Sequence, residues 1–150
     1  KVIHTPGHAS NHLCYLLEEE GMIFTGDHIM NGSTVVISPP DGNMKHYLES
    51  LEMLKNYNLK TIAPGHGEVL NDPHTVTKWI INHRLDREDK VLRVIKSLGQ
   101  GDANSLVEEV YDDVSPSLFP IAKWSLEAHL IKLKEDGILF KENNLYKVIT

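Results

Sequence analysis

Three side chains that can bind a metal ion each follow a glycine directly in this 150-residue chain: His8, Asp27 and His66. Each lies at the end of a short apolar run, and proline also precedes the glycine before both histidines. Proline fixes one backbone dihedral and glycine allows conformations that other residues avoid, so the chain can turn sharply and direct the next side chain off the end of a sheet. Imidazole and carboxylate are ligands that zinc prefers, and iron or manganese also fits them. The pattern predicts a metal site built from three distant positions.

Asp27 could also bridge two metal ions. A carboxylate between two imidazole sites suits a pair of ions about 3.5–4 Å apart, which generates a hydroxide nucleophile and stabilises the leaving oxygen. Either histidine alone is more typical of a turn, and only its combination with Asp27 favours metal binding.

The chain has nine histidines, and the seven besides His8 and His66 have other expected roles. His4 and His12 flank His8 and are expected to be structural or to support a ligand, whereas His28 suits a structural role as well as a place in the site wall. The remaining four are interpreted as ordinary surface or interface residues: His46, His74, His83 and His129.

Composition excludes several classes of protein. The formal charge is -6, and residues 1–83 and 84–150 are both acidic, which disfavours a nucleic-acid binder. The single cysteine, Cys14, excludes an intramolecular disulfide, suits a reducing compartment and is expected to be an inert buried thiol. The apolar runs are far shorter than the ~20 residues that cross a bilayer. We therefore expect a soluble, cytoplasmic protein with no membrane partner.

Residues 1–70 alternate short apolar runs with turn residues. One helix is predicted from Met44 to Leu54, where apolar residues recur at helical spacing after a start signal at Asp41 or Asn43. The other runs predict strands at 2–3, 13–17, 22–25, 34–37 and 60–63. The order of strands and helix implies a layered α/β arrangement.

After Asp72-Pro73, a typical helix start, the pattern becomes helical. One long helix, or two in series, is predicted to end at Gly99, and a short helix follows with a capping box at Ser105–Glu108. A third helix ends at Gly137, and runs at 138–141 and 145–149 predict a β-hairpin. The apolar stripe of that third helix, expected to face the core, contains Ile121, Trp124, Ala128 and Ile131. Three helices and a hairpin resemble a winged-helix unit, with a boundary near residue 83.

These motifs together carry a family resemblance. The segments His4–His8, Phe24–Asp27 and Pro64–Gly67, in this order, resemble the second half of the metallo-β-lactamase superfamily. The helices and hairpin are similar to the winged-helix extension of its β-lactamase-like protein 2 branch, which Asp41–Met44 also resembles. The resemblance implies an α/β (α+β) chain. Residues 1–83 would be the C-terminal part of an αβ/βα sandwich, and residues 84–150 a winged-helix-like domain.

The resemblance also implies roles for the three side chains. His8 would bind the first metal, His66 the second, and Asp27 would bridge both as the catalytic carboxylate, with two Zn²⁺ ions (or Mn²⁺ or Fe) per intact protein. The family's His-x-His-x-Asp-His motif, which supplies the other ligands, is absent from the chain, and the chain starts at Lys1 without a methionine. We therefore expect that the start is missing and that this part alone is inactive.

Several functions are compatible with the sequence. In the intact hydrolase, a metal-bound hydroxide would attack an ester, thioester, amide or phosphodiester of a small-molecule or RNA substrate. Alternatively, residues 84–150 bind nucleic acid or a protein, with a structural upstream half, or they only cover the sandwich or mediate dimerisation. The basic residues between Arg84 and Lys96 wind around their helix among acidic ones, which favours a solvated, ion-paired helix. A half-sandwich would expose an edge and an apolar face, so we expect a homo-oligomer.

Overall fold

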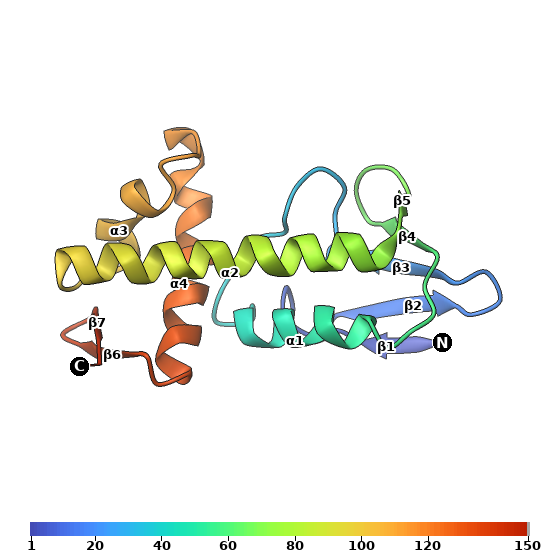
Figure 1. Cartoon of the computed structure of the whole chain (residues 1–150), viewed down its shortest axis with the longest axis horizontal. Coiled ribbons are helices and arrows are strands. Elements are labelled where there is room, and N and C mark those ends of the chain that lie inside the picture. Colours follow the sequence, from blue (N-terminus) through green and yellow to red (C-terminus); the bar gives the residue numbers. More distant parts are fainter. Residues whose placement is uncertain (150) are drawn as a thin grey trace. The chain divides into compact units, whose positions relative to one another are not determined.

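A computed structural model describes residues 1–149 of the chain (Figure 1). These residues form two compact units, Lys1–His83 and a second unit that begins at Arg84. The first contains a five-stranded sheet and helix α1 (Met44–Leu54). The division falls within α2 (Pro73–Leu98), so each unit includes part of this helix. Within the described residues, no helix combines the length and apolar character needed to cross a bilayer.

The sheet of the first unit contains one parallel pair of strands. Its strands, in spatial order, are β1 (Val2–His4), β2 (Leu13–Leu17), β3 (Met22–Gly26), β4 (Thr61–Pro64) and β5 (Leu70–Asn71). Neighbours are antiparallel except β3 and β4, which are parallel and are joined through the connection that contains α1. The carboxyl ends of β3 and β4 therefore lie at the same edge of the sheet.

Side chains of the sheet alternate between a buried and an exposed face. The buried positions include Ile3, Cys14, Leu16, Ile23 and Ile62, and the exposed apolar positions are Val2, Leu13, Tyr15, Leu17 and Phe24. The prediction that Cys14 is a buried free thiol is confirmed, and burial raises the pKa of this thiol to about 11. A thiol with that pKa stays protonated and is a poor nucleophile.

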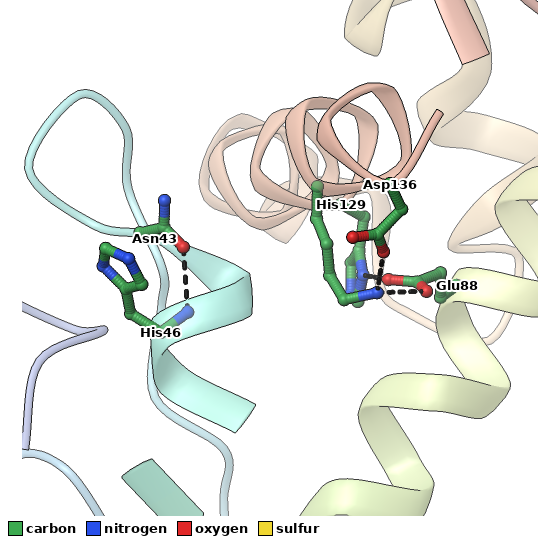
Figure 2. Close-up of polar contacts among 6 residues, drawn as sticks. Asn43, His46, Glu88, His129 and Asp136 are labelled. Carbon is green, nitrogen blue, oxygen red and sulfur yellow. Dashed lines mark hydrogen bonds and ion pairs between the residues drawn. The ribbon is translucent and has the colours of Figure 1, made fainter. Parts of the chain in front are cut away.

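The helix predicted from Met44 to Leu54 is confirmed. Of the two candidate start residues, Asn43 and not Asp41 is the N-cap. The Asn43 side-chain oxygen accepts a hydrogen bond from the His46 backbone N–H at 2.9 Å, which caps the first turn of α1 (Figure 2). By contrast, the strand predicted at 34–37 is wrong, because these residues lie in the irregular connection between β3 and α1. Val35 and Ile37 are nevertheless buried. The β-branched run therefore indicated burial and not a regular strand.

The second unit contains the predicted helices and hairpin. They are α3 (Ala103–Val110), the 3₁₀ turn η1 (Pro116–Leu118), α4 (Phe119–Glu135), β6 (Leu139–Glu142) and β7 (Leu145–Val148). α2 is one continuous helix up to Leu98, rather than two. The capping box of α3 is formed by Asp102 and Ser105, three residues before the predicted one, because Asp102 accepts from the Ser105 N–H at 2.9 Å. Asn143 and Asn144 both have positive φ and make the tight turn between β6 and β7.

The predicted core stripe of α4 is wrong. Trp124 is 53% exposed and Ile121 is 44% exposed, although Ala128 is buried. The core of the second unit instead takes Leu126, Leu130 and Leu133 from α4. α4 has apolar residues on more than one side, so its own periodicity could not decide which side faces the core.

His129 is also misplaced by the prediction, because it is fully buried and is not a surface residue. Its Nδ1 lies 3.3 Å from Oε2 of Glu88 on α2, and Lys132 donates to the other oxygen of Glu88 at 2.7 Å and to Asp136 at 2.8 Å (Figure 2). Nε2 of His129 has no partner among the described residues. A neutral His129 ring with its proton on Nδ1 fits this arrangement, because Nδ1 can then donate to Glu88. Nε2 carries no proton in this form, so the ring has no buried N–H group without an acceptor.

Acidification is therefore expected to destabilise the fold through His129. Burial lowers its pKa below the ordinary 6.5, and the charges of Arg84 and Lys132 add to this effect against the opposing influence of Glu88. Below pH 6.5 the His129 side chain binds a proton in the unfolded chain but not in the folded chain. The free energy of unfolding therefore decreases as the pH is lowered, by at most about 1.4 kcal/mol per pH unit for one proton. His129→Gln is expected to flatten this fall between pH 7 and 5 in thermal unfolding. The exposed control His74→Gln should leave it unchanged, and equal slopes for the two variants would contradict the assignment.

Candidate metal centre

The ends of β3 and β4 approach each other more closely than a side chain would allow. Gly26 pairs with Pro64, and the Gly65 N–H donates to the Gly26 carbonyl at 2.8 Å. A Cβ atom on Gly65 would lie 2.9 Å from the Gly26 carbonyl carbon and 3.1 Å from Oδ1 of Asp27. Glycine at position 65 therefore lets the two strand ends meet.

This approach brings two of the three predicted ligands together. Oδ1 of Asp27 lies 3.3 Å from Nε2 of His66, although 39 residues separate them in the chain. The two side chains are 47% and 71% exposed, so both are open to a ligand from solvent. An acidic oxygen and an imidazole nitrogen at this separation can bind one metal ion after a small adjustment.

The third predicted ligand, His8, lies in a loop that is fixed on α1. The Asn43 N–H donates to the Gly7 carbonyl at 2.8 Å, and the Ser50 hydroxyl donates to the Pro6 carbonyl at 2.7 Å. Nδ1 of His8 lies 2.8 Å from the Val36 carbonyl. Because a carbonyl oxygen only accepts, Nδ1 carries the proton and the lone pair of Nε2 is left available for a metal. No pattern in the sequence indicates the role of Val36, because its carbonyl acts from a distant position without any side-chain requirement.

Two further histidines lie in the same electrostatic neighbourhood. Burial and the charge of His8 lower the pKa of His12, against the attraction of Asp27. Burial, with the charges of His12 and His8, lowers the pKa of His28 to about 3, and neither ring nitrogen of His28 has a partner among the described residues. Five titratable side chains therefore belong to this edge of the sheet: His8, His12, Asp27, His28 and His66.

Four histidines of the first unit lie outside this group: His4, His46, His74 and His83. Nε2 of His4 lies 2.9 Å from the Ser10 carbonyl, and Nδ1 of His12 lies 2.8 Å from the Thr5 hydroxyl, so both side chains help to hold the loop. His46 and His74 are exposed, and His83 stacks on Trp79.

The donor set suits a divalent metal but is incomplete. Imidazole and carboxylate donors, with an oriented His8, match zinc, iron or manganese chemistry. Within residues 1–149, however, no three His, Cys, Asp or Glu side chains are close enough to hold a metal ion by themselves. The fold and these side chains define an α/β protein with a candidate pair of metal ligands, Asp27 and His66, at the carboxyl ends of two parallel strands.

Comparison with known proteins supports the family resemblance. Residues 1–66 match the metallo-beta-lactamase superfamily, and residues 103–146 match the beta-lactamase associated winged helix domain. These two matches, in the order predicted from the sequence, confirm the resemblance to the metallo-beta-lactamase superfamily and the fold class inferred from the sequence.

The similar proteins are all longer than this chain. A beta-lactamase-like protein 2 homolog of Drosophila melanogaster is 34% identical over 93% of this chain and 47% of its own length. An atrochrysone carboxyl ACP thioesterase of Aspergillus fumigatus is 27% identical over 94% of this chain and 48% of its own. In fold alone, a metallo-beta-lactamase family protein of Thermus thermophilus matches 99% of this chain and 49% of its own with a TM-score of 0.87 and 23% identity. The chain thus spans about half the length of the curated relatives it matches.

Proposed function

We propose that this chain is the C-terminal part of a metal-dependent hydrolase that cleaves an ester or thioester. The observation that carries the proposal is the 3.3 Å approach of Asp27 to His66 at the edge where β3 and β4 end. The match to the superfamily supports the hydrolytic class.

Each side chain has a defined part in this proposal. His66 and His8 would each bind one of two metal ions, zinc or alternatively iron or manganese, and Asp27 would bridge them. When bound, such ions would activate water as a nucleophile and stabilise the negative charge that develops on the attacked carbonyl oxygen. The Val36 carbonyl keeps the proton of His8 on Nδ1 and thereby presents Nε2 to the site. The Gly65 N–H bond to Gly26 keeps the segments of Asp27 and His66 together.

A thioester is the bond class that the relatives favour. Several of the similar fungal proteins are named thioesterases, among them one of Aspergillus fumigatus and one of Emericella nidulans. A phosphodiester is chemically accessible to the same metal centre, so an RNA substrate is the competing proposal and belongs in the test.

Metal content and hydrolysis, measured on two lengths of protein, test the proposal. The 150-residue chain and a form extended upstream to the length of its relatives are compared by mass spectrometry for metal and with S-hexanoyl-N-acetylcysteamine and a short RNA as substrates. About two metal ions and thioester hydrolysis in the extended form only are expected. An extended form that is metal-free and inactive on both substrates would exclude the hydrolase, and RNA cleavage alone would exclude the thioesterase.

The alternative of nucleic-acid binding by the second unit has weaker support. Arg87 forms a bidentate pair with Asp113 at 2.7 and 2.8 Å, and Lys90 pairs with Asp112. The prediction of an ion-paired helix is confirmed for these two residues, although Arg87 is buried and not solvated as expected. Cations that are already paired with carboxylates contribute little to phosphate binding. The winged-helix unit is therefore better suited to a packing or protein-contact role.

We also propose that the 150-residue chain self-associates through its exposed sheet face. Val2, Tyr15 and Phe24 are between 46% and 59% exposed on neighbouring strands, and Leu13 and Leu17 extend this apolar face. Contiguous apolar surface of this kind is usually covered by another protein surface. Light scattering at micromolar concentration is expected to give a dimer or larger species, and Tyr15→Lys should shift it toward monomer. A clean monomer of the unaltered chain would contradict this proposal.

A further inference from the structure

An apolar cavity of about 270 Å³ lies in the first unit, outside the set of metal-binding side chains. Its walls come from the connection after β3, from β5 and from the start of α2, which are labelled in Figure 1. The residues that line it are Met30, Gly32, Leu70, Thr75, Val76, Trp79 and Ile80.

One wall of this cavity is formed by residues that closely follow Asp27 in the chain. Met30 and Gly32 follow Asp27 by three and five residues. Between them, Asn31 donates from its backbone N–H to the His66 carbonyl at 3.2 Å and from its side chain to the Glu68 carbonyl at 3.4 Å. The segment that forms the wall is therefore bonded to the segment that presents His66.

The lining selects an apolar ligand. Among the described residues, no charged side chain lines the cavity, and the hydroxyl of Thr75 in the lining donates to Asp72 at 2.7 Å. Trp79 is 55% exposed and stacks on His83, so its indole ring can contact a ligand that enters from solvent. A phosphate or sugar would find no charged partner in this lining, whereas a hydrocarbon chain would bury apolar surface on both sides.

We propose that this cavity binds the acyl chain of the substrate and so sets the preference for acyl length. The inference rests on the proposed hydrolase, because the lining residues Met30 and Leu70 follow Asp27 and His66 by three and four residues in the chain. The volume suits a few methylene groups or one aromatic ring, and it is too small for a folded protein segment.

Binding to the 150-residue chain tests this inference without any need for activity. Trp79 and Trp124 are the two tryptophans of the chain, so Trp124→Phe leaves Trp79 as the sole indole reporter. Acetyl-, butyryl- and hexanoyl-N-acetylcysteamine are titrated by Trp79 fluorescence and by calorimetry. Each buried methylene contributes about 0.8 kcal/mol, or up to roughly fourfold in affinity, so hexanoyl is expected to bind at least about tenfold more tightly than acetyl.

Matched variants locate the site. Val76→Asp places a charge in the lining, and Val69→Asp makes the same change at an exposed valine outside it. The increase in affinity from the acetyl to the hexanoyl thioester is expected to disappear in Val76→Asp and to persist in Val69→Asp. Because Val76 is partly buried, Trp79→Ala provides a second test at an exposed position and should reduce this increase in calorimetry. Equal affinity for acetyl and hexanoyl, or equal effects of the two valine variants, would overturn the inference.

Failure of the acyl site and failure of the hydrolase give different results. Hydrolysis by the extended protein with no dependence on acyl length would keep the hydrolase and overturn the acyl site. Binding that depends on acyl length, without any hydrolysis, would support an apolar ligand site and contradict the proposed hydrolase. Complete protection of Trp79 from acrylamide quenching in the ligand-free extended protein would show that protein fills the cavity, which would also overturn the inference.

Discussion

Hydrolysis by the extended protein is expected to fall by about a thousandfold when Asp27 is replaced by Asn. The amide keeps the size of the side chain but removes the negative charge that would bind two metal ions, and loss of several kcal/mol of transition-state stabilisation corresponds to that factor. The bound metal should fall below two ions per chain in mass spectrometry. Initial rates with S-hexanoyl-N-acetylcysteamine measure the change in activity.

Asp89→Asn is the matched control for this variant. Asp89 is exposed on α2 and undergoes the same change of charge, so it corrects for the change in net charge. Its rate and metal content are expected to equal those of the unaltered protein. If the Asp27→Asn protein binds two metal ions and retains more than a tenth of the rate of the unaltered protein, Asp27 is not part of the proposed centre.

The second large effect is on stability, with Gly7→Ala expected to lower the free energy of unfolding by about 3–5 kcal/mol. Gly7 has a φ of 148° and its missing side chain faces the first turn of α1. A Cβ atom there would lie 2.3 Å from the Cα of Tyr47, which is backbone and cannot rotate away. The helix or the His8 loop must therefore shift. Urea denaturation of the 150-residue chain, followed by circular dichroism, measures the loss.

Gly32→Ala is the control that measures the cost of positive φ without a steric clash. Gly32 also has positive φ, at 78°, but a Cβ atom there would meet nothing within 4 Å. This control is expected to lose only about 1 kcal/mol, the cost of an L-residue in that region. Equal losses in the two variants would show that the contact with Tyr47 does not limit position 7.

Much of the local structure could be predicted because it depends on residues close in the chain. The apolar spacing from Met44 to Leu54 defined α1, since residues three and four apart share one face of a helix. Asn143-Asn144 defined the turn of the hairpin because asparagine tolerates positive φ. The glycine before Asp27 and before His66 marked two strand ends, and the order of these motifs carried the family resemblance.

Other features depended on contacts between distant segments, which no local pattern encodes. Only the parallel pairing of β3 with β4 brings Asp27 within 3.3 Å of His66, and only the fold places the Val36 carbonyl on His8. The exposure of Trp124 and the burial of His129 were predicted wrongly for the same reason. The type of a side chain indicates only whether it prefers water or the core, and its neighbours in the folded protein determine whether it is buried. Glu88 provides a hydrogen-bond partner for His129 inside the protein. The core face of α4 is occupied by Leu126, Leu130 and Leu133.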